Sequence, residues 1–273
     1  LYYCNTHMIL KEPFKYRSVF ISDVHLGFRG CNAKLLTSFL RNIECEYLYL
    51  VGDIIDIWSL KSKKYWPQSH NNVVRTILGK AKHNTKVIYI TGNHDEMIRD
   101  YGSLMLGNVF IKEREIHTTA DNKKFLVLHG DQFDGVVKYQ KWLSKLGSVA
   151  YDYLLLISAF ISHIRNKFNL PHWSLSNFLK YKVKNAVSYI SSYEKAVSHT
   201  AEKEGVDGIV CGHIHHAEIS MINEVKYMNC GDWVESCTAL VETHDGEIQL
   251  IRWSDVYENL LKENNPVVKL RTG

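Results

Sequence analysis

The sequence of 273 residues contains little proline and has no strong charge bias. It has 4 Pro and 16 Gly, and its 33 Lys and Arg nearly balance 29 Asp and Glu, for a net charge of +4. This composition excludes a collagen-like repeat and a low-complexity linker, and it argues against nucleic acid as a partner. With 45% apolar and 23% charged residues, we expect a single folded domain over residues 1–273.

The six cysteines are scattered and form no Cys-x-x-Cys pair. This excludes a zinc ribbon and a small disulfide scaffold, so we expect reduced thiols in a cytoplasmic protein. No basic segment leads into an apolar stretch near the start, and no signal peptide is expected. The longest apolar run, Tyr153–Ile161, is too short to span a bilayer. Since the chain begins at Leu1, Met8 is the expected alternative start.

Short apolar runs rich in Val, Ile, Tyr and Phe predict buried strands. These runs are Ser18–Ile21, Tyr47–Val51, Val87–Ile90, Phe125–Leu128 and Ile209–Cys211. Helical periodicity over Ala33–Arg41 and Asn72–Lys82 separates the early strands. Alternating strands and helices predict an α/β fold with a parallel or mixed sheet.

Two later regions have a different pattern. Val225–Asn229, Cys237–Glu242 and Glu247–Trp253 predict a β-meander that forms a second sheet, with a hairpin turn at Asp245-Gly246. Between two of the polar clusters described below, from about Phe133 to Glu204, only helical periodicity is present. We therefore expect a helical insertion over residues 134–204, within the single domain.

Each of the first five predicted strands is followed directly by polar residues that can bind metal. The clusters are Asp23-Val24-His25, Gly52-Asp53, Gly92-Asn93-His94-Asp95, His129-Gly130-Asp131 and Gly212-His213-Ile214-His215. Functional loops gather at the carboxyl ends of such strands. Carboxylate, imidazole and amide ligands without thiolate suit Mn²⁺, Fe or Zn²⁺. Two Asp, one Asn and four His are too many for one ion with an open position, which predicts two ions sharing a bridging carboxylate.

In their order and spacing, these clusters resemble the five motifs of the calcineurin-like metallophosphoesterases. The resemblance implies a β-sandwich flanked by helices, in four αββα layers. It implies that one divalent ion, Mn²⁺ before Fe or Zn²⁺, is bound by Asp23, His25, Asp53 and His215. The other ion would be bound by Asp53, Asn93, His129 and His213, with Asp53 bridging. His94 would stabilise the transition state or protonate the leaving oxygen, and Asp56 would orient His94.

Several segments resemble, more closely, the UDP-2,3-diacylglucosamine diphosphatases of lipid A synthesis. They are Phe20–Leu26, Gly52–Trp58, His129–Asp131 with Tyr139-Gln140, and Gly231–Trp233. This resemblance implies hydrolysis of a nucleotide-diphosphate lipid to UMP and a lipid phosphate, with the insertion as a lid over the acyl chains. The candidate substrate-binding residues are Arg29, Tyr139, Trp173, Lys182 and Lys184. The best-known members carry arginine where this chain has His94, so the substrate itself is left open.

The composition of the insertion also suits a lipid. No acidic residue lies between Asp152 and Glu194, whereas basic and aromatic residues are frequent there. This predicts contact with an anionic membrane surface, which would make the protein peripheral on the inner face of the cell membrane. The alternative is a helix hairpin packed on the core with a solvated basic face.

Other interpretations of the pattern stay open. A metal-dependent phosphodiesterase or nuclease would use the same ligands, whereas a non-catalytic scaffold is disfavoured because all seven ligands are present. Asp56 and Asp95 could instead cap a helix or turn, and Arg29 could be a simple surface residue. Asp131 is expected to fix its loop, and histidines outside the motifs are expected in the core or at the surface. The role of His216, beside the last ligand, is open, and the sequence does not indicate an oligomeric state.

Overall fold

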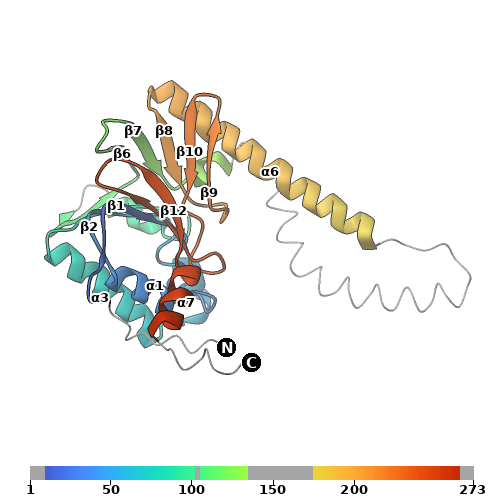
Figure 1. Cartoon of the computed structure of the whole chain (residues 1–273). Helices are drawn as coiled ribbons and strands as arrows, with labels where there is room; N and C mark the ends of the chain where they lie inside the picture. Colours follow the sequence, from blue (N-terminus) through green and yellow to red (C-terminus); the bar gives the residue numbers. More distant parts are fainter. Residues whose placement is uncertain (1–9, 102–104, 135–174, 265–273) are drawn as a thin grey trace, which may run out of the picture. The chain divides into compact units, whose positions relative to one another are not determined.

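The computed structural model describes residues 10–101, 105–134 and 175–264 (Figure 1). By its contacts the chain divides into two compact units. One is Gln132–Val197, and the other combines Leu1–Asp131 with Ser198–Gly273. Both β-sheets belong to the second of these, which also carries all the residues predicted to bind metal.

The larger sheet has seven strands in the order β12-β11-β1-β2-β3-β5-β4. Their bounds are β1 Phe14–Ile21, β2 Ile43–Val51, β3 Lys86–Ile90, β4 Met105–Leu106, β5 Val109–Lys112, β11 Thr238–Glu242 and β12 Ile248–Arg252. The strands β1, β2, β3 and β5 pair in parallel, while β11, β12 and β4 pair antiparallel with their neighbours. The sheet is therefore mixed, as the sequence predicts.

The smaller sheet has five strands in the order β6-β7-β8-β10-β9. Their bounds are β6 Arg114–Thr118, β7 Lys124–Leu128, β8 Gly208–Cys211, β9 Glu218–Ile222 and β10 Val225–Asn229. The central strands β7, β8 and β10 are parallel, and the edge strands β6 and β9 are antiparallel to them. Because β7 and β8 run in the same direction, their carboxyl ends lie at the same edge of the sheet.

Alternation of side chains along β1 divides the core into two layers. Val19 and Ile21 pack with residues of α1 (Ala33–Arg41), α3 (Gln68–Lys82) and α7 (Trp253–Asn264), which cover one face of the larger sheet (Figure 1). Phe20, between them, packs with residues of the smaller sheet such as Val210. The result is the expected arrangement of two sheets flanked by helices.

The prediction of a β-meander after Cys211 is wrong. Only β10 belongs to the smaller sheet, whereas β11 and β12 form a hairpin at the edge of the larger sheet. The chain crosses between the sheets at Cys230–Cys237, where the Asp232 carboxylate accepts the amides of Val234 (2.7 Å) and Glu235 (2.5 Å). β11 pairs with β1 of the larger sheet, and both of its faces are buried. The predicted turn at Asp245-Gly246 is confirmed, with Gly246 at φ +91°.

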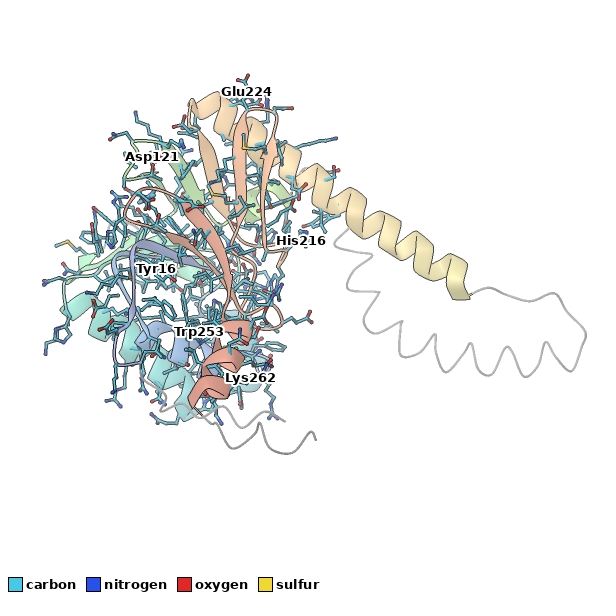
Figure 2. The ribbon with its side chains drawn as sticks, viewed as in Figure 1. Tyr16, Asp121, His216, Glu224, Trp253 and Lys262 are labelled. Atoms are coloured by element: carbon cyan, nitrogen blue, oxygen red, sulfur yellow. The ribbon has the colours of Figure 1, made fainter. Side chains whose placement is uncertain are left out.

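Most predicted elements agree with the observed ones. The helix Ala33–Arg41 has its predicted bounds, and α3 begins four residues early, directly after Pro67. The strands β4, β5, β6 and β9 and the short helix α2 (Ile57–Lys63) were not predicted. α7 was not predicted either; it begins at Trp253 (Figure 2). The buried Trp253 ring lies edge-on to Phe39, with ring centroids 5.3 Å apart.

The helical insertion over 134–204 stays a prediction. Within it the structure describes α6, Leu175–Glu204, and the remaining residues lie outside the described ranges. No helix among the described residues combines the length and the apolar character that crossing a bilayer requires.

A buried polar cluster joins the two sheets. Glu242 on β11 accepts hydrogen bonds from Ser18 of β1 (2.6 Å) and from the Ala120 amide (2.8 Å). His117 Nε2 of β6 and Arg17 each lie 2.7 Å from its carboxylate. Burial alone would raise the pKa of Glu242, but the hydrogen bonds from His117 and Ser18 lower it to about 2.

We expect Glu242→Gln to lower the free energy of unfolding at pH 7 by about 2–4 kcal/mol, because it leaves Arg17 and His117 without their anion. The unfolded carboxylate has a pKa near 4.5 and the folded one near 2. The contribution is therefore complete above pH 4.5 and is lost as the pH falls toward 2. Urea unfolding at pH 7 and pH 3 should show the difference from wild type shrinking at pH 3.

Glu224→Gln is the matched control, since Glu224 is exposed in the turn between β9 and β10 (Figure 2). It should change stability by less than about 0.5 kcal/mol at both pH values. An equal loss for Glu242→Gln at pH 7 and pH 3 would contradict the role of the charge.

Candidate metal centre

The residues predicted to bind metal lie directly after five strand ends. Asp23 and His25 follow β1, Asp53 follows β2 and Asn93 follows β3 in the larger sheet. In the smaller sheet, His129 follows β7, and His213 and His215 follow β8. Packing of the two sheets brings these ends to one place, so donors up to 192 residues apart come within contact distance.

Asp23, His25 and His215 form one group that could hold a cation, with their ligand atoms within 4.8 Å of one another. His215 Nε2 lies 3.2 Å from Asp23 Oδ1. The Nε2 atoms of His25 and His215 lie 3.4 Å apart. Two imidazole nitrogens and a buried carboxylate facing a common point are the donors that a first-row divalent ion uses.

Asp53, His129 and His213 form a second group with the same spacing. His129 Nε2 lies 3.4 Å from Asp53 Oδ2. Its other ring nitrogen, Nδ1, lies 2.9 Å from the Val51 carbonyl. Donation from Nδ1 to this carbonyl leaves Nε2 as the nitrogen that can bind metal.

Asn93 provides an independent test of whether cations fit here. Its Oδ1 is buried and receives no hydrogen bond from any described residue. A buried amide oxygen without a donor costs free energy, which a bound cation removes. The amide oxygen, the two carboxylates and the four imidazoles therefore fit divalent metal.

The backbone at the centre is held in an unusual conformation. None of the seven candidate ligands is glycine, and yet five of them have left-handed φ values. They are Asp23 (50°), His25 (55°), Asp53 (53°), His213 (72°) and His215 (55°). This conformation costs about 1–2 kcal/mol for each such residue and recurs at functional sites.

Glycine is required beside these residues because the side chains approach the backbone closely. A Cβ at Gly92 would lie 2.2 Å from Asp53 Oδ1 and 2.6 Å from the Asp53 amide. A Cβ at Gly212 would lie 2.5 Å from Asp23 Oδ2. Any side chain at these positions would displace a carboxylate of the centre.

The charges of the centre are strongly coupled. Burial alone would raise the pKa of Asp23, but the hydrogen bond with His215 and the neighbouring histidines hold it well below its usual range. Burial alone would lower the pKa of His129, but the carboxylates of Asp53 and Asp23 raise it to about 10. The buried carboxylates thus hold positive charge beside them. Protons compete with metal for the same nitrogens, so metal affinity falls as the pH falls.

His94 lies at the edge of the centre. Its Nε2 is 3.9 Å from Asp53 Oδ2 and its Nδ1 is 3.0 Å from Asp56 Oδ1. Burial would lower the pKa of His94, but the hydrogen bond with Asp56 raises it. His94 also forms a third candidate group with His25 and Asp53, so distance alone does not separate ligand from proton donor.

Asp56 makes the contacts that both roles considered for it from the sequence would require. It caps α2, where its carboxylate accepts the Ser59 amide at 2.7 Å, and it contacts Nδ1 of His94. Asp56 Oδ2 also lies 3.4 Å from His25 Nδ1. One carboxylate therefore orients two imidazoles of the centre.

The other candidates have structural contacts. Asp95 is buried and accepts hydrogen bonds from the Gly92 amide (2.6 Å), the Ile54 amide (2.9 Å) and the Tyr89 hydroxyl (2.7 Å). It thus fixes the loops that carry Asp53 and Asn93. His216 is exposed (Figure 2), and its Nε2 lies 3.4 Å from Glu218 Oε2.

The candidate substrate-binding residues are only partly described. Arg29 is exposed and its guanidinium lies over the Tyr65 ring, 5.0 Å from the centroid. Lys182 and Lys184 lie on α6, while Tyr139 and Trp173 lie outside the described residues. Their role in substrate binding stays a prediction.

Two supporting residues were not predicted. Arg99 donates to Asp131 (2.7 Å) and to the Gly92 carbonyl (3.2 Å), and so joins the loop of Asn93 to the loop of His129. Asp131 fixes its loop, as expected. His70 Nδ1 accepts the Gly27 amide at 3.0 Å and holds the loop after His25. Neither residue lies in a motif, so spacing alone carries no signal for them.

A profile of the calcineurin-like phosphoesterase family matches residues 16–217. This range is about three quarters of the chain and includes all seven residues predicted to bind metal. The chain belongs to the calcineurin-like phosphoesterase family and is a metal-dependent phosphoesterase. Members of this family depend on divalent metal, in agreement with the candidate groups described above.

Two curated relatives carry the same name. The UDP-2,3-diacylglucosamine hydrolase of Haemophilus influenzae is 25% identical over 250 residues, which are 86% of this chain and 98% of the relative. The UDP-2,3-diacylglucosamine hydrolase of Blochmanniella pennsylvanica is 27% identical over 118 residues. That match covers 41% of this chain and 46% of the relative, so it spans about half of that relative's length.

Similar solved structures include a hypothetical protein from Pyrococcus horikoshii, with 11% identity, 92% and 94% of the two chains covered, and a TM-score of 0.45. An archaeal phosphodiesterase has 16% identity, 86% and 98% coverage, and a TM-score of 0.39. With TM-scores below 0.5, neither similarity bears on the activity of this chain.

We expect Gly92→Ala to weaken metal binding by at least about tenfold, because the new Cβ displaces the Asp53 carboxylate and its amide. Elemental analysis after loading with Mn²⁺ and gel filtration would measure the loss. Gly79→Ala on α3 is the control, since a Cβ there meets nothing within 4 Å. It should keep full metal content and raise the free energy of unfolding by about 0.5–1 kcal/mol. Full metal content in Gly92→Ala would contradict the close approach.

Proposed function

We propose that this chain hydrolyses the pyrophosphate of a nucleotide-activated glycolipid, in a reaction of the UDP-2,3-diacylglucosamine to UMP and lipid phosphate type. The observation that carries the proposal is the match over 98% of the Haemophilus influenzae UDP-2,3-diacylglucosamine hydrolase. The family profile over residues 16–217 also spans every strand end that carries a candidate ligand. The substrate is an expectation from that relative's name.

We assign the candidate ligands to two divalent ions. Asp23, His25, Asp53 and His215 would hold one ion, and Asp53, Asn93, His129 and His213 would hold the other. This assignment is supported by the two groups whose donor atoms lie within 4.8 Å and by the buried Oδ1 of Asn93. Divalent ions held there would lower the pKa of water and neutralise phosphate charge; Mn²⁺ is the expected metal.

The other side chains supply orientation and a proton. His94 Nε2 faces the centre and, when protonated, can donate to the leaving oxygen or stabilise developing negative charge. Asp56 holds the opposite ring nitrogen at 3.0 Å, which fixes the tautomer and the direction of the ring. Asp53 in turn accepts the His94 amide at 2.8 Å and so ties the proton donor to the carboxylate of the centre.

The proposed substrate would reach the enzyme from a membrane surface. A diacylated sugar nucleotide resides at a membrane surface, and residues 153–193 contain basic and apolar side chains but no acidic ones. We infer that this segment meets the lipid and the membrane surface, with its basic residues near anionic headgroups. The protein would then act as a peripheral enzyme on the cytoplasmic face.

Turnover of UDP-2,3-diacylglucosamine by the Mn²⁺-loaded protein tests the proposal, with UMP release measured by chromatography. We expect hydrolysis of this lipid in preference to bis-p-nitrophenyl phosphate. Asp53→Ala should abolish activity and lower bound metal toward one or zero ions per chain, because the bridging carboxylate has no substitute. Hydrolysis of the diester without the lipid would favour the alternative, a phosphodiesterase. His94 stands where the best-known UDP-2,3-diacylglucosamine diphosphatases carry arginine, which leaves the substrate open.

His94→Ala should lower turnover by about 10²–10⁴-fold and leave the metal content unchanged, because it removes a proton donor without removing a ligand. Steady-state kinetics and elemental analysis on the same preparation would measure both quantities. His83→Ala, which removes an exposed histidine at the end of α3, is the control and should match wild type. Loss of metal in His94→Ala would show that His94 is a ligand.

A further inference from the structure

Trp58 places an exposed aromatic ring directly beside the metal centre. Its indole lies against the His94 ring, with centroids 4.3 Å apart and an interplanar angle of 36°. The Trp58 side chain is 45% exposed, although it lies against His94, whose Nε2 is 3.9 Å from Asp53 Oδ2. Exposed apolar side chains are common, but one that lies beside the proposed catalytic groups can contact the substrate.

The position of Trp58 is fixed by the elements around it. It is the second residue of α2, and the Asp56 cap holds the start of this helix through the Ser59 amide. The amide of Ile57 donates to the His94 carbonyl at 3.2 Å, so the helix and the His94 loop keep one register. Trp58 is therefore a preformed surface.

Phe28 adds a second exposed ring near the centre. Its amide donates to the His25 carbonyl at 2.9 Å, which places it on the loop of a candidate ligand, and it is 43% exposed. Phe28 lies on the loop after His25, and Trp58 of α2 packs against His94. The rings of His25 and His94 are 4.7 Å apart. An exposed aromatic residue is thus present on the segment beside each of these histidines.

We propose that Trp58 stacks the nucleobase of the substrate and so makes the enzyme selective for a nucleotide. The inference rests on the proposed nucleotide-diphosphate substrate. The base is the planar part of such a molecule, and an indole face suits a planar π-system. An acyl chain, in contrast, gains most from an enclosed apolar groove, whereas Trp58 is a single open ring beside charged groups.

Binding of UMP and of ribose 5-phosphate to the Mn²⁺-loaded protein isolates the contribution of the base. Both ligands carry the same phosphate, so their affinity ratio cancels effects on the metal centre. Stacking on an aromatic side chain changes affinity by about 5- to 150-fold. By isothermal titration calorimetry we expect the wild type to prefer UMP by at least about tenfold and Trp58→Ala to lose most of that preference.

Two variants control the measurement. Trp58→Phe keeps an aromatic ring and should keep the ratio within about threefold of wild type. Trp66→Ala removes an indole that is 37% exposed but faces His70 and Asn71, and it should leave the ratio unchanged. If Trp58→Ala does not fold, the wild-type ratio alone still decides, since equal binding of UMP and ribose 5-phosphate overturns the proposal.

Binding of dodecyl phosphate, below its critical micelle concentration, tests whether Trp58 contacts an acyl chain instead of a nucleobase. If Trp58→Ala weakens its binding and leaves UMP unchanged, the ring contacts a hydrocarbon chain and the proposal is wrong. The binding experiment does not depend on turnover of the lipid. A Trp58-dependent preference for UMP without hydrolysis of UDP-2,3-diacylglucosamine would uphold the base platform and overturn only the proposed substrate.

Discussion

Two buried carboxylates, Asp23 and Asp53, set the main physical constraint on this structure. Each is almost fully buried, and each keeps a lowered pKa only because positive charge stands beside it. Burial of unpaired charge would cost several kcal/mol, so the imidazoles beside the two carboxylates are required to offset that cost. The left-handed backbone at both residues, with φ of 50° and 53°, directs the two carboxylates into the same space.

The packing of the two sheets provides the rest of the centre. The larger sheet supplies the carboxylates and the smaller sheet supplies His129, His213 and His215, so neither sheet holds the complete set of candidate ligands. The apolar layer between them, with Phe20 and Val210 among its members, therefore controls distances at the metal centre. The Glu242 cluster joins the same two sheets through polar contacts, which couples the stability of the sandwich to its alignment.

His94 lies between the candidate metal centre and the surface proposed to receive the substrate. Asp56 orients its ring, the Asp53 carboxylate holds its amide and Trp58 covers one face. A proton donor fixed on three sides loses little entropy when the substrate binds. The same helix start that caps α2 thus positions both the proposed acid and the proposed base platform.

The strand-end clusters, the α/β class and the family could all be inferred from the sequence, because buried strands produce apolar runs and ligands follow them at short, fixed spacing. Local periodicity also predicted Ala33–Arg41 and the Asp245-Gly246 turn. The tertiary structure alone decided that β11 and β12 join the larger sheet, since strand partners depend on contacts far apart in sequence. It also decided that Arg99 and His70 support the ligand loops and that Trp58 lies against His94. Those contacts join residues of different loops, and no local pattern records which loops meet once the two sheets have packed.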